Sequence, residues 1–200
     1  VNFEGHREIL GVSVSLSEAE VHWRDFFEQL SSRGLNGMEL IISDDHPGLK
    51  SARKSVFPSI PWQRCTFHMS QNAQAYVPKK SMREEIAQSV RDIFNSPTRE
   101  VAFAVKEAII KNYSLSAPDF CRWLEGNIEE GLTFMNFPRS YWKKIRTSNV
   151  VERVNGEIRR RTRVARLFPN KDSCLRLVTA VLQEIHETWK SGKRYLTFES

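Results

Sequence analysis

The sequence predicts an α/β protein in which a strand-rich beginning is followed by an all-helical segment and then by a basic helix. Three observations predict this class. Residues 1–67 contain short apolar runs of strand length, residues 81–142 show the apolar spacing of helices, and positive charge gathers late in the chain. Of the 200 residues, 40% are hydrophobic, which is ample for a packed core.

The first 80 residues are expected to hold the strands. Apolar and small residues alternate up to residue 16, which predicts two strands joined by a turn at Glu4 and Gly5. A helix with an aromatic face follows over residues 17–34. The short apolar run 38–42 then predicts a strand buried on both faces, and residues 62–67 after the Pro61 break are predicted to form a further strand.

Residues 81–142 are predicted to form several helices, because apolar residues recur there every three or four positions. We interpret this segment as a helical insertion between a first part of the core, residues 1–80, and a last part, residues 143–200. Trp123 and Trp142 lie in the insertion, where packing is the favoured role and stacking on bases the alternative.

Composition excludes several classes of protein. The three cysteines, Cys65, Cys121 and Cys174, are odd in number and far apart, which argues against a disulfide framework. No run of about 18 apolar residues and no signal peptide is seen, so we expect a cytoplasmic protein without a membrane partner. Because the chain starts at Val1 without a methionine, we also expect a fragment.

Positive charge is concentrated between Lys143 and Arg166. This stretch has nine Lys or Arg and two Glu, a local charge of +7, while the whole chain carries +6. The remaining residues therefore sum to −1. A surplus this concentrated in a helix-forming segment indicates a surface that binds a polyanion, with the phosphodiester backbone of nucleic acid as the leading candidate.

Two interpretations of Glu152 are open. In a helix that begins near Asn149, the valines and Ile158 lie on one side and Glu152, Gly156 and Arg159 on the other. Glu152 could close a capping box with Asn149, at the start of a solvated basic helix. The pattern alone favours that interpretation over a catalytic one.

Asp44 follows the strand predicted at residues 38–42, at a position where sheets flanked by helices gather ligands. It is a candidate metal ligand, although Asp44, Asp45 or His46 could instead cap the helix that Pro47 opens. The C-x-x-H pair of Cys65 and His68 is a weak zinc signal, since no second ligand pair accompanies it. A buried thiol and a hydrogen-bonded histidine are the favoured interpretation.

Four motifs, in this order, give the chain its resemblance to a known family: GHREILGV, ISDDHPGLKSA, WQRCTFHMSQNAQAYVP and RTSNVVERVNGEIRRRTRVARLFPN. Together they resemble bacterial insertion-sequence transposases of the Mutator type, which belong to the DDE transposases. The resemblance covers nearly the whole chain. It implies a ribonuclease-H-like core with an N-terminally truncated mixed sheet, flanking helices and an all-α insertion.

The resemblance also implies a reaction and a metal. Members of the family cleave DNA at the ends of the element and join the 3′ hydroxyl of the cut strand to another site. The reaction uses two Mg²⁺ ions bound by carboxylates, with Mn²⁺ as a substitute. Asp44 matches the second catalytic aspartate and Glu152 the catalytic glutamate. The first aspartate is expected upstream of Val1, so we expect this fragment to be inactive alone. Four further residues match family motifs without an assigned role: Cys65, His68, Asn149 and Asn155.

The implied partners are the terminal inverted repeats of the element, the target DNA and further copies of the protein in a homo-oligomer. In a bacterial cell the DNA-bound protein would be associated with the nucleoid. Cations that would hold phosphates are Lys143, Lys144, Arg153, Arg159, Arg160, Arg161, Arg163 and Arg166. The alternative is a non-catalytic DNA-binding or assembly module, and a less favoured one is a nuclease unrelated to transposition.

Overall fold

A computed structural model describes residues 1–15, 17–163 and 168–198, and most of them are helical. Contacts within the chain divide it into two compact units. Unit 1 comprises Val1–Met38, His46–Ser59 and Asn149–Ser200, and unit 2 comprises Glu39–Asp45 and Ile60–Ser148. Each unit is therefore built from segments that are distant in the sequence.

The sheet of unit 2 has two parallel strands, β1 (Ile41–Ser43) and β2 (Trp62–Arg64), with Ile41 opposite Trp62. Both strands were predicted, and both are shorter than their apolar runs. The prediction was wrong for residues 66 and 67, because helix α3 (Thr66–Ala73) begins directly after Cys65. All three residues of β2 are buried, whereas β1, the strand predicted to be buried on both faces, is only half-buried.

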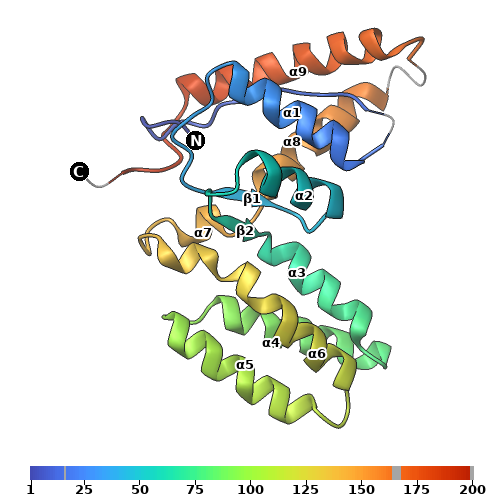
Figure 1. Cartoon of the computed structure of the whole chain (residues 1–200), viewed down its shortest axis with the longest axis vertical. Coiled ribbons are helices and arrows are strands. Elements are labelled where there is room, and N and C mark those ends of the chain that lie inside the picture. Colours follow the sequence, from blue (N-terminus) through green and yellow to red (C-terminus); the bar gives the residue numbers. More distant parts are fainter. Residues whose placement is uncertain (16, 164–167, 199–200) are drawn as a thin grey trace. The chain divides into compact units, whose positions relative to one another are not determined.

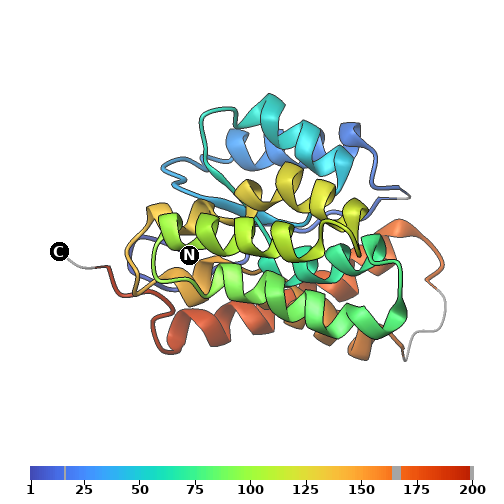
Figure 2. The same cartoon turned by 90° about the horizontal axis from the view of Figure 1, so that it is seen from below.

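The remainder of unit 2 is helical, which confirms the prediction for residues 81–142. Helices α4 and α5 pack against each other, and α6 packs against α5 (Figures 1 and 2). The long helices are α4 (Arg83–Phe94), α5 (Arg99–Tyr113) and α6 (Pro118–Asn127), and a short α7 (Trp142–Ile145) follows them. Single 3₁₀ turns lie at Gln74–Tyr76, Lys80–Met82, Ile128–Gly131 and Thr133–Asn136.

A hydrophobic core holds unit 2 together. Trp123 is buried and stacks on Tyr76 with ring centroids 5.6 Å apart, which confirms a packing role. Gln63 of β2 is fully buried too, and its side chain accepts from the Phe134 amide and donates to the Gly131 carbonyl. Other fully buried side chains are Met69, Ile86, Val90, Ile93, Phe120, Leu124, Ile128 and Leu132. The polar bridge from Gln63 anchors the sheet to the turns that follow α6.

Unit 1 contains two pairs of packed helices. The first pair is α1 (Glu20–Ser32) with α2 (Pro47–Val56), joined by a contact of the Phe27 and Phe57 rings at 5.5 Å. The second pair is α8 (Asn149–Thr162) with α9 (Lys171–Ser191), which lie side by side in Figure 1. The basic stretch of the sequence therefore belongs to a helix with a packed partner.

The two strands predicted over residues 1–16 are wrong for the described residues, which form a turn and no strand. The backbone groups there bond elsewhere. The Ile9 amide donates to the His186 ring, and the Gly5 carbonyl accepts from the amides of Tyr195 and Leu196. Gly5 itself has φ +87°, which favours glycine, so the expected turn is present. An alternating pattern forms a strand only where a neighbouring strand pairs with it.

The fold class is thus confirmed only as α/β with one small sheet. A larger mixed sheet is not formed by the residues that the structure describes, so a ribonuclease-H-like core stays a prediction. The division into residues 1–80, 81–142 and 143–200 also stays a prediction. None of the described helices is both long enough and apolar enough to cross a membrane.

Candidate functional site

Asp44, Cys65 and His68 come together at one end of the sheet. Asp44 follows β1 and Cys65 follows β2, and because the strands are parallel, these two residues leave the sheet at the same edge. The Cys65 amide donates to the Ser43 carbonyl at 2.8 Å and continues the ladder. Asp44 Oδ1, Cys65 Sγ and a ring nitrogen of His68 all lie within 4.8 Å of one another.

The start of α3 explains why Cys65 and His68 point the same way. Cys65 occupies the N-cap position and His68 the first turn, so their side chains share one end of the helix. The Cys65 side chain is fully buried, whereas the side chains of His68 and Asp44 are 25% and 53% exposed. His68 Nδ1 contacts Asp44 Oδ1 directly. The expected buried thiol is present, and the histidine contacts a carboxylate.

Ser148 joins this group from 104 positions away. Its hydroxyl donates to Asp44 Oδ1 at 3.4 Å, and its backbone amide donates to Cys65 Sγ at 3.3 Å. The Arg146 carbonyl accepts from the Thr66 amide nearby, so three hydrogen bonds link the strand ends and the start of α3 to residues 146–148. Sequence reasoning did not single out Ser148, because no local pattern indicates a partner so distant.

Asp45 has a different environment from Asp44. Its carboxylate pairs at 3.0 Å with Arg64, whose side chain is only 2% exposed and also contacts Asn127 and Glu130. The alternative interpretation is that Asp44, Asp45 or His46 caps the helix α2. His46 stands at the N-cap position and makes no capping hydrogen bond through its side chain. The adjacent acids therefore divide into a structural residue, Asp45, and a half-exposed one, Asp44.

Glu152 lies in the first turn of α8, in unit 1, and is half-buried. The helix begins at Asn149 itself, so Ser148 is the residue that precedes it. Asn149 and Asn155 are exposed. Val151 is 57% exposed, although its valine neighbours are half-buried, so the apolar side of α8 is narrower than expected.

Comparison with known proteins decides the family. The family model described as "Transposase, Mutator family" matches residues 1–192. The chain belongs to the Mutator family of transposases. It is 48% identical over 198 residues to the transposase for insertion sequence element IS406 of Burkholderia multivorans, covering 99% of this chain and 51% of that protein.

Other Mutator-family relatives match over the same extent. Identity is 38% over 199 residues to the IS1081 transposase of Mycobacterium tuberculosis, with 100% of this chain and 48% of that protein covered. It is 36% over 200 residues to the transposase for IS256 in transposon Tn4001 of Staphylococcus aureus, with 98% and 50% covered. The chain spans about half the length of these curated relatives.

The cations of this Mutator-family chain fall into two groups. Arg160 and Arg161 both pair with Glu157, at 2.6 and 2.9 Å, and Arg161 also pairs with Glu184 of α9 at 2.6 Å. These guanidinium groups lower the pKa of Glu157 from 4.5 to about 2. Further exposed cations are Lys143 and Lys144 on α7, Arg153 and Arg159 on α8 and Arg163 directly after it, while Arg166 lies outside the described residues. The spacing of Glu157 to Arg160 and Arg161 could have revealed the pairing from sequence.

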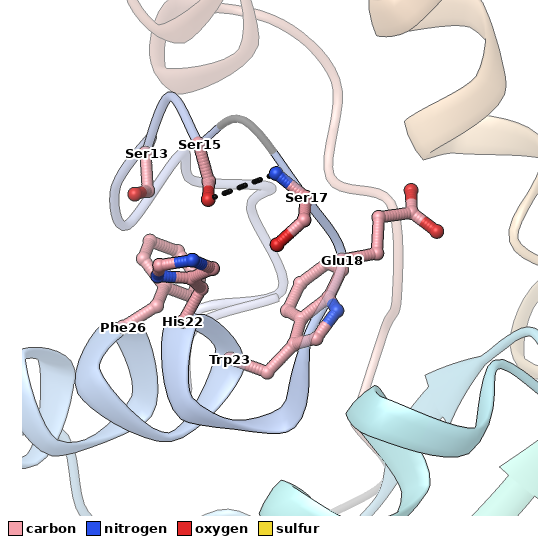
Figure 3. Close-up of a pocket in the computed structure, with 7 residues that line it drawn as sticks. All are labelled: Ser13, Ser15, Ser17, Glu18, His22, Trp23 and Phe26. Carbon is pink, nitrogen blue, oxygen red and sulfur yellow. Dashed lines mark hydrogen bonds between the residues drawn. The ribbon is translucent and has the colours of Figure 1, made fainter.

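Figure 3 shows a pocket in unit 1 that none of the expected site residues lines. Its volume is about 410 Å³, and Trp23, Phe26 and His22 of α1 form one wall. Serine hydroxyls form the other, and Ser15 Oγ accepts from the Ser17 amide at 3.4 Å. One carboxylate, that of Glu18, also lines the pocket, and no thiol does.

Proposed function

We propose that this chain carries part of the catalytic site of a DDE transposase that cleaves and joins DNA at the ends of its insertion element. The observation that carries this proposal is the half-exposed carboxylate of Asp44 at the end of a parallel strand, in a chain that belongs to the Mutator family. Asp44 matches the second catalytic aspartate of such enzymes, and Glu152 matches the catalytic glutamate.

The donor chemistry of these residues fits Mg²⁺. Magnesium prefers carboxylate oxygens, and both Asp44 and Glu152 supply them. Asp44 is 53% exposed, so an ion and a DNA strand can reach it from solvent. Bound Mg²⁺ would activate the attacking oxygen and stabilise the leaving oxygen in a displacement at phosphorus. His68 and Ser148 contact Asp44 Oδ1 and restrict the rotation of the carboxylate that would hold the ion.

DNA would contact the exposed cations of each unit, those of α7 in unit 2 and those of α8 in unit 1. Lys143 and Lys144 are exposed on α7, and Arg153, Arg159 and Arg163 are exposed on or beside α8. These groups would contact phosphates, and binding would weaken steeply as salt rises. Terminal repeats and target DNA are the proposed partners, and a homo-oligomer would bring two element ends together.

The test is a pair of adjacent substitutions in the full-length protein. Asp44→Asn is expected to reduce cleavage of terminal-repeat DNA by on the order of 100-fold or more, because it removes a metal-binding charge. Asp45→Asn is the matched control. It weakens the pairing of buried Arg64 and lowers the free energy of unfolding by about 1–2 kcal/mol, while cleavage below the melting temperature persists.

Two outcomes would count against the proposal. If Asp44→Asn or Glu152→Gln cleaves DNA at the rate of the parent protein, the substituted residue is not part of the catalytic site. Salt-dependent DNA binding without any divalent-metal requirement or cleavage would favour a non-catalytic DNA-binding module. Cleavage without strand-transfer products would favour a nuclease.

A further inference from the structure

The cluster at the end of the sheet contains three chemically different ligand atoms. Asp44 offers a carboxylate oxygen, Cys65 a sulfur and His68 a ring nitrogen, all within 4.8 Å of one another. Within residues 1–15, 17–163 and 168–198 this is the only group of three such residues close enough to share an ion. One ion would therefore be held from two strand ends and the first turn of α3.

The kinds of donor atom select the class of metal. Thiolate sulfur and imidazole nitrogen are ligands for zinc and similar transition metals, whereas magnesium prefers oxygen alone. Atoms that share a tetrahedral zinc ion lie about 3.5 Å apart, given bond lengths of about 2.0–2.3 Å. The three side chains need only small adjustments to reach that spacing. Three protein ligands also leave a fourth position for water, as in open zinc sites.

The groups around the cluster form hydrogen bonds like those that orient the ligands in known metal sites. Metal ligands are commonly oriented by hydrogen bonds from neighbouring groups. Here the Ser148 amide donates to Cys65 Sγ and the Ser148 hydroxyl donates to Asp44 Oδ1. Cys65 is fully buried, while Asp44 and His68 are partly exposed and leave a route for an ion.

We propose that Asp44, Cys65 and His68 form a binding site for a zinc-class transition metal, which differs from the proposed Mg²⁺ site in all its ligands but Asp44. On binding, the Cys65 thiol releases its proton to solvent and the sulfur ligates the metal. The site requires neither Glu152 nor DNA. It shares Asp44 with the proposed function, and on that function rests one consequence: excess zinc occupies Asp44 and inhibits cleavage.

The test uses Co²⁺ as a spectroscopic substitute for zinc. The purified chain is treated with chelator and titrated with Co²⁺. We expect one equivalent to bind with a sulfur-to-cobalt charge-transfer band and the visible bands of tetrahedral cobalt. Zn²⁺ should remove these bands at equal concentration, and a large excess of Mg²⁺ should not. A folded chain, verified by circular dichroism, that shows no such bands would overturn the proposal.

Variants assign the ligands. Cys65→Ser should lose the charge-transfer band, and His68→Gln should weaken Co²⁺ binding at least about 10-fold. His68 is partly exposed, so its variant remains informative if Cys65→Ser fails to fold. Cys121→Ser and Cys174→Ser are matched controls and should keep the band. Loss of the band in either control, with retention in Cys65→Ser, would place the metal elsewhere and refute the site.

A last variant separates this proposal from the proposed function. Glu152→Gln should bind Co²⁺ like the parent while losing DNA cleavage. A parent protein that cleaves DNA but shows no cobalt bands would refute the transition-metal site alone. A chain that binds Co²⁺, in which Glu152→Gln leaves cleavage unchanged, would refute the catalytic assignment of Glu152 and support the transition-metal site.

Discussion

The backbone amide of Ser148 donates a hydrogen bond to Cys65 Sγ at 3.3 Å, although 83 positions separate these residues. The same serine donates through its hydroxyl to Asp44. Ser148 is also the last residue before α8, the helix that carries Glu152. Ser148 thus directly precedes the helix that carries Glu152 and also orients the side chain of Asp44.

This relationship predicts an effect of Ser148→Ala. The substitution removes the hydroxyl bond to Asp44 and keeps the backbone bond to Cys65. We expect the Mg²⁺ concentration that gives half-maximal cleavage to rise up to about 10-fold, because the Asp44 carboxylate loses one of the hydrogen bonds that orient it. Ser140→Ala, at an exposed position, is the control. A lower melting temperature with an unchanged Mg²⁺ requirement would show that Ser148 acts only in folding.

The two groups of cations on α8 predict different effects on DNA binding. Arg159→Gln should weaken binding to any DNA sequence and reduce the salt slope by about 1, since an exposed cation contacts one phosphate. Arg161→Gln should change the slope less, because Glu157 and Glu184 already pair with that side chain. Binding titrations at several salt concentrations measure both slopes, and equal slopes for the two variants would contradict this division.

Replacing Gly156 by alanine is predicted to have opposite effects on the stability of the chain and on its affinity for DNA. It lies inside α8, where a glycine costs roughly 0.5–1 kcal/mol relative to alanine, and a methyl group added there would meet no described atom within 4 Å. We expect Gly156→Ala to stabilise the free chain by about that amount. If the bare backbone serves close approach of DNA, the same change should weaken DNA binding.

Gly126→Ala is the matched control for this effect. Gly126 also lies inside a helix, α6, with open space around it. Its replacement should raise the melting temperature similarly and leave DNA affinity unchanged. If Gly156→Ala stabilises the chain and binds DNA like the parent, Gly156 has no part in the interface.

The ion pairs of Glu157 predict a titration well below the ordinary range. Hydrogen bonds from Arg160 and Arg161 lower the pKa of Glu157 from 4.5 to about 2. A lowered pKa means that the stabilisation is fully present above about pH 4.5 and is lost as the pH falls through about 2. Carbon-13 NMR of the Glu157 carboxyl should show this midpoint.

Replacing both arginines by glutamine should return that midpoint toward 4.5. High salt should shift it in the same direction, because exposed ion pairs are screened. A midpoint near 4.5 in the parent chain at low salt would show that the pairs do not persist in solution.

The sequence by itself determined the helical character of residues 81–142 and the basic surface of α8. Helical periodicity is a local property, since residues three and four apart share a face wherever the chain forms a helix. The motifs around Asp44 and Glu152 also carried the family, which the comparison then showed. Local alternation failed at residues 1–15, because a strand depends on a partner that the segment itself does not specify.

Only the tertiary structure decided how the site residues are grouped. Parallel pairing of β1 and β2 brings Asp44 beside Cys65, and the hydrogen bonds of Ser148 act across more than 80 positions. The fold also gives the adjacent Asp45 a different environment from Asp44, because the Asp45 carboxylate pairs with the buried Arg64. Residues that are close in space but distant in sequence leave no local pattern. The sequence therefore showed only Cys65 and His68 of the C-x-x-H pair, and the structure added Asp44 as a third possible ligand.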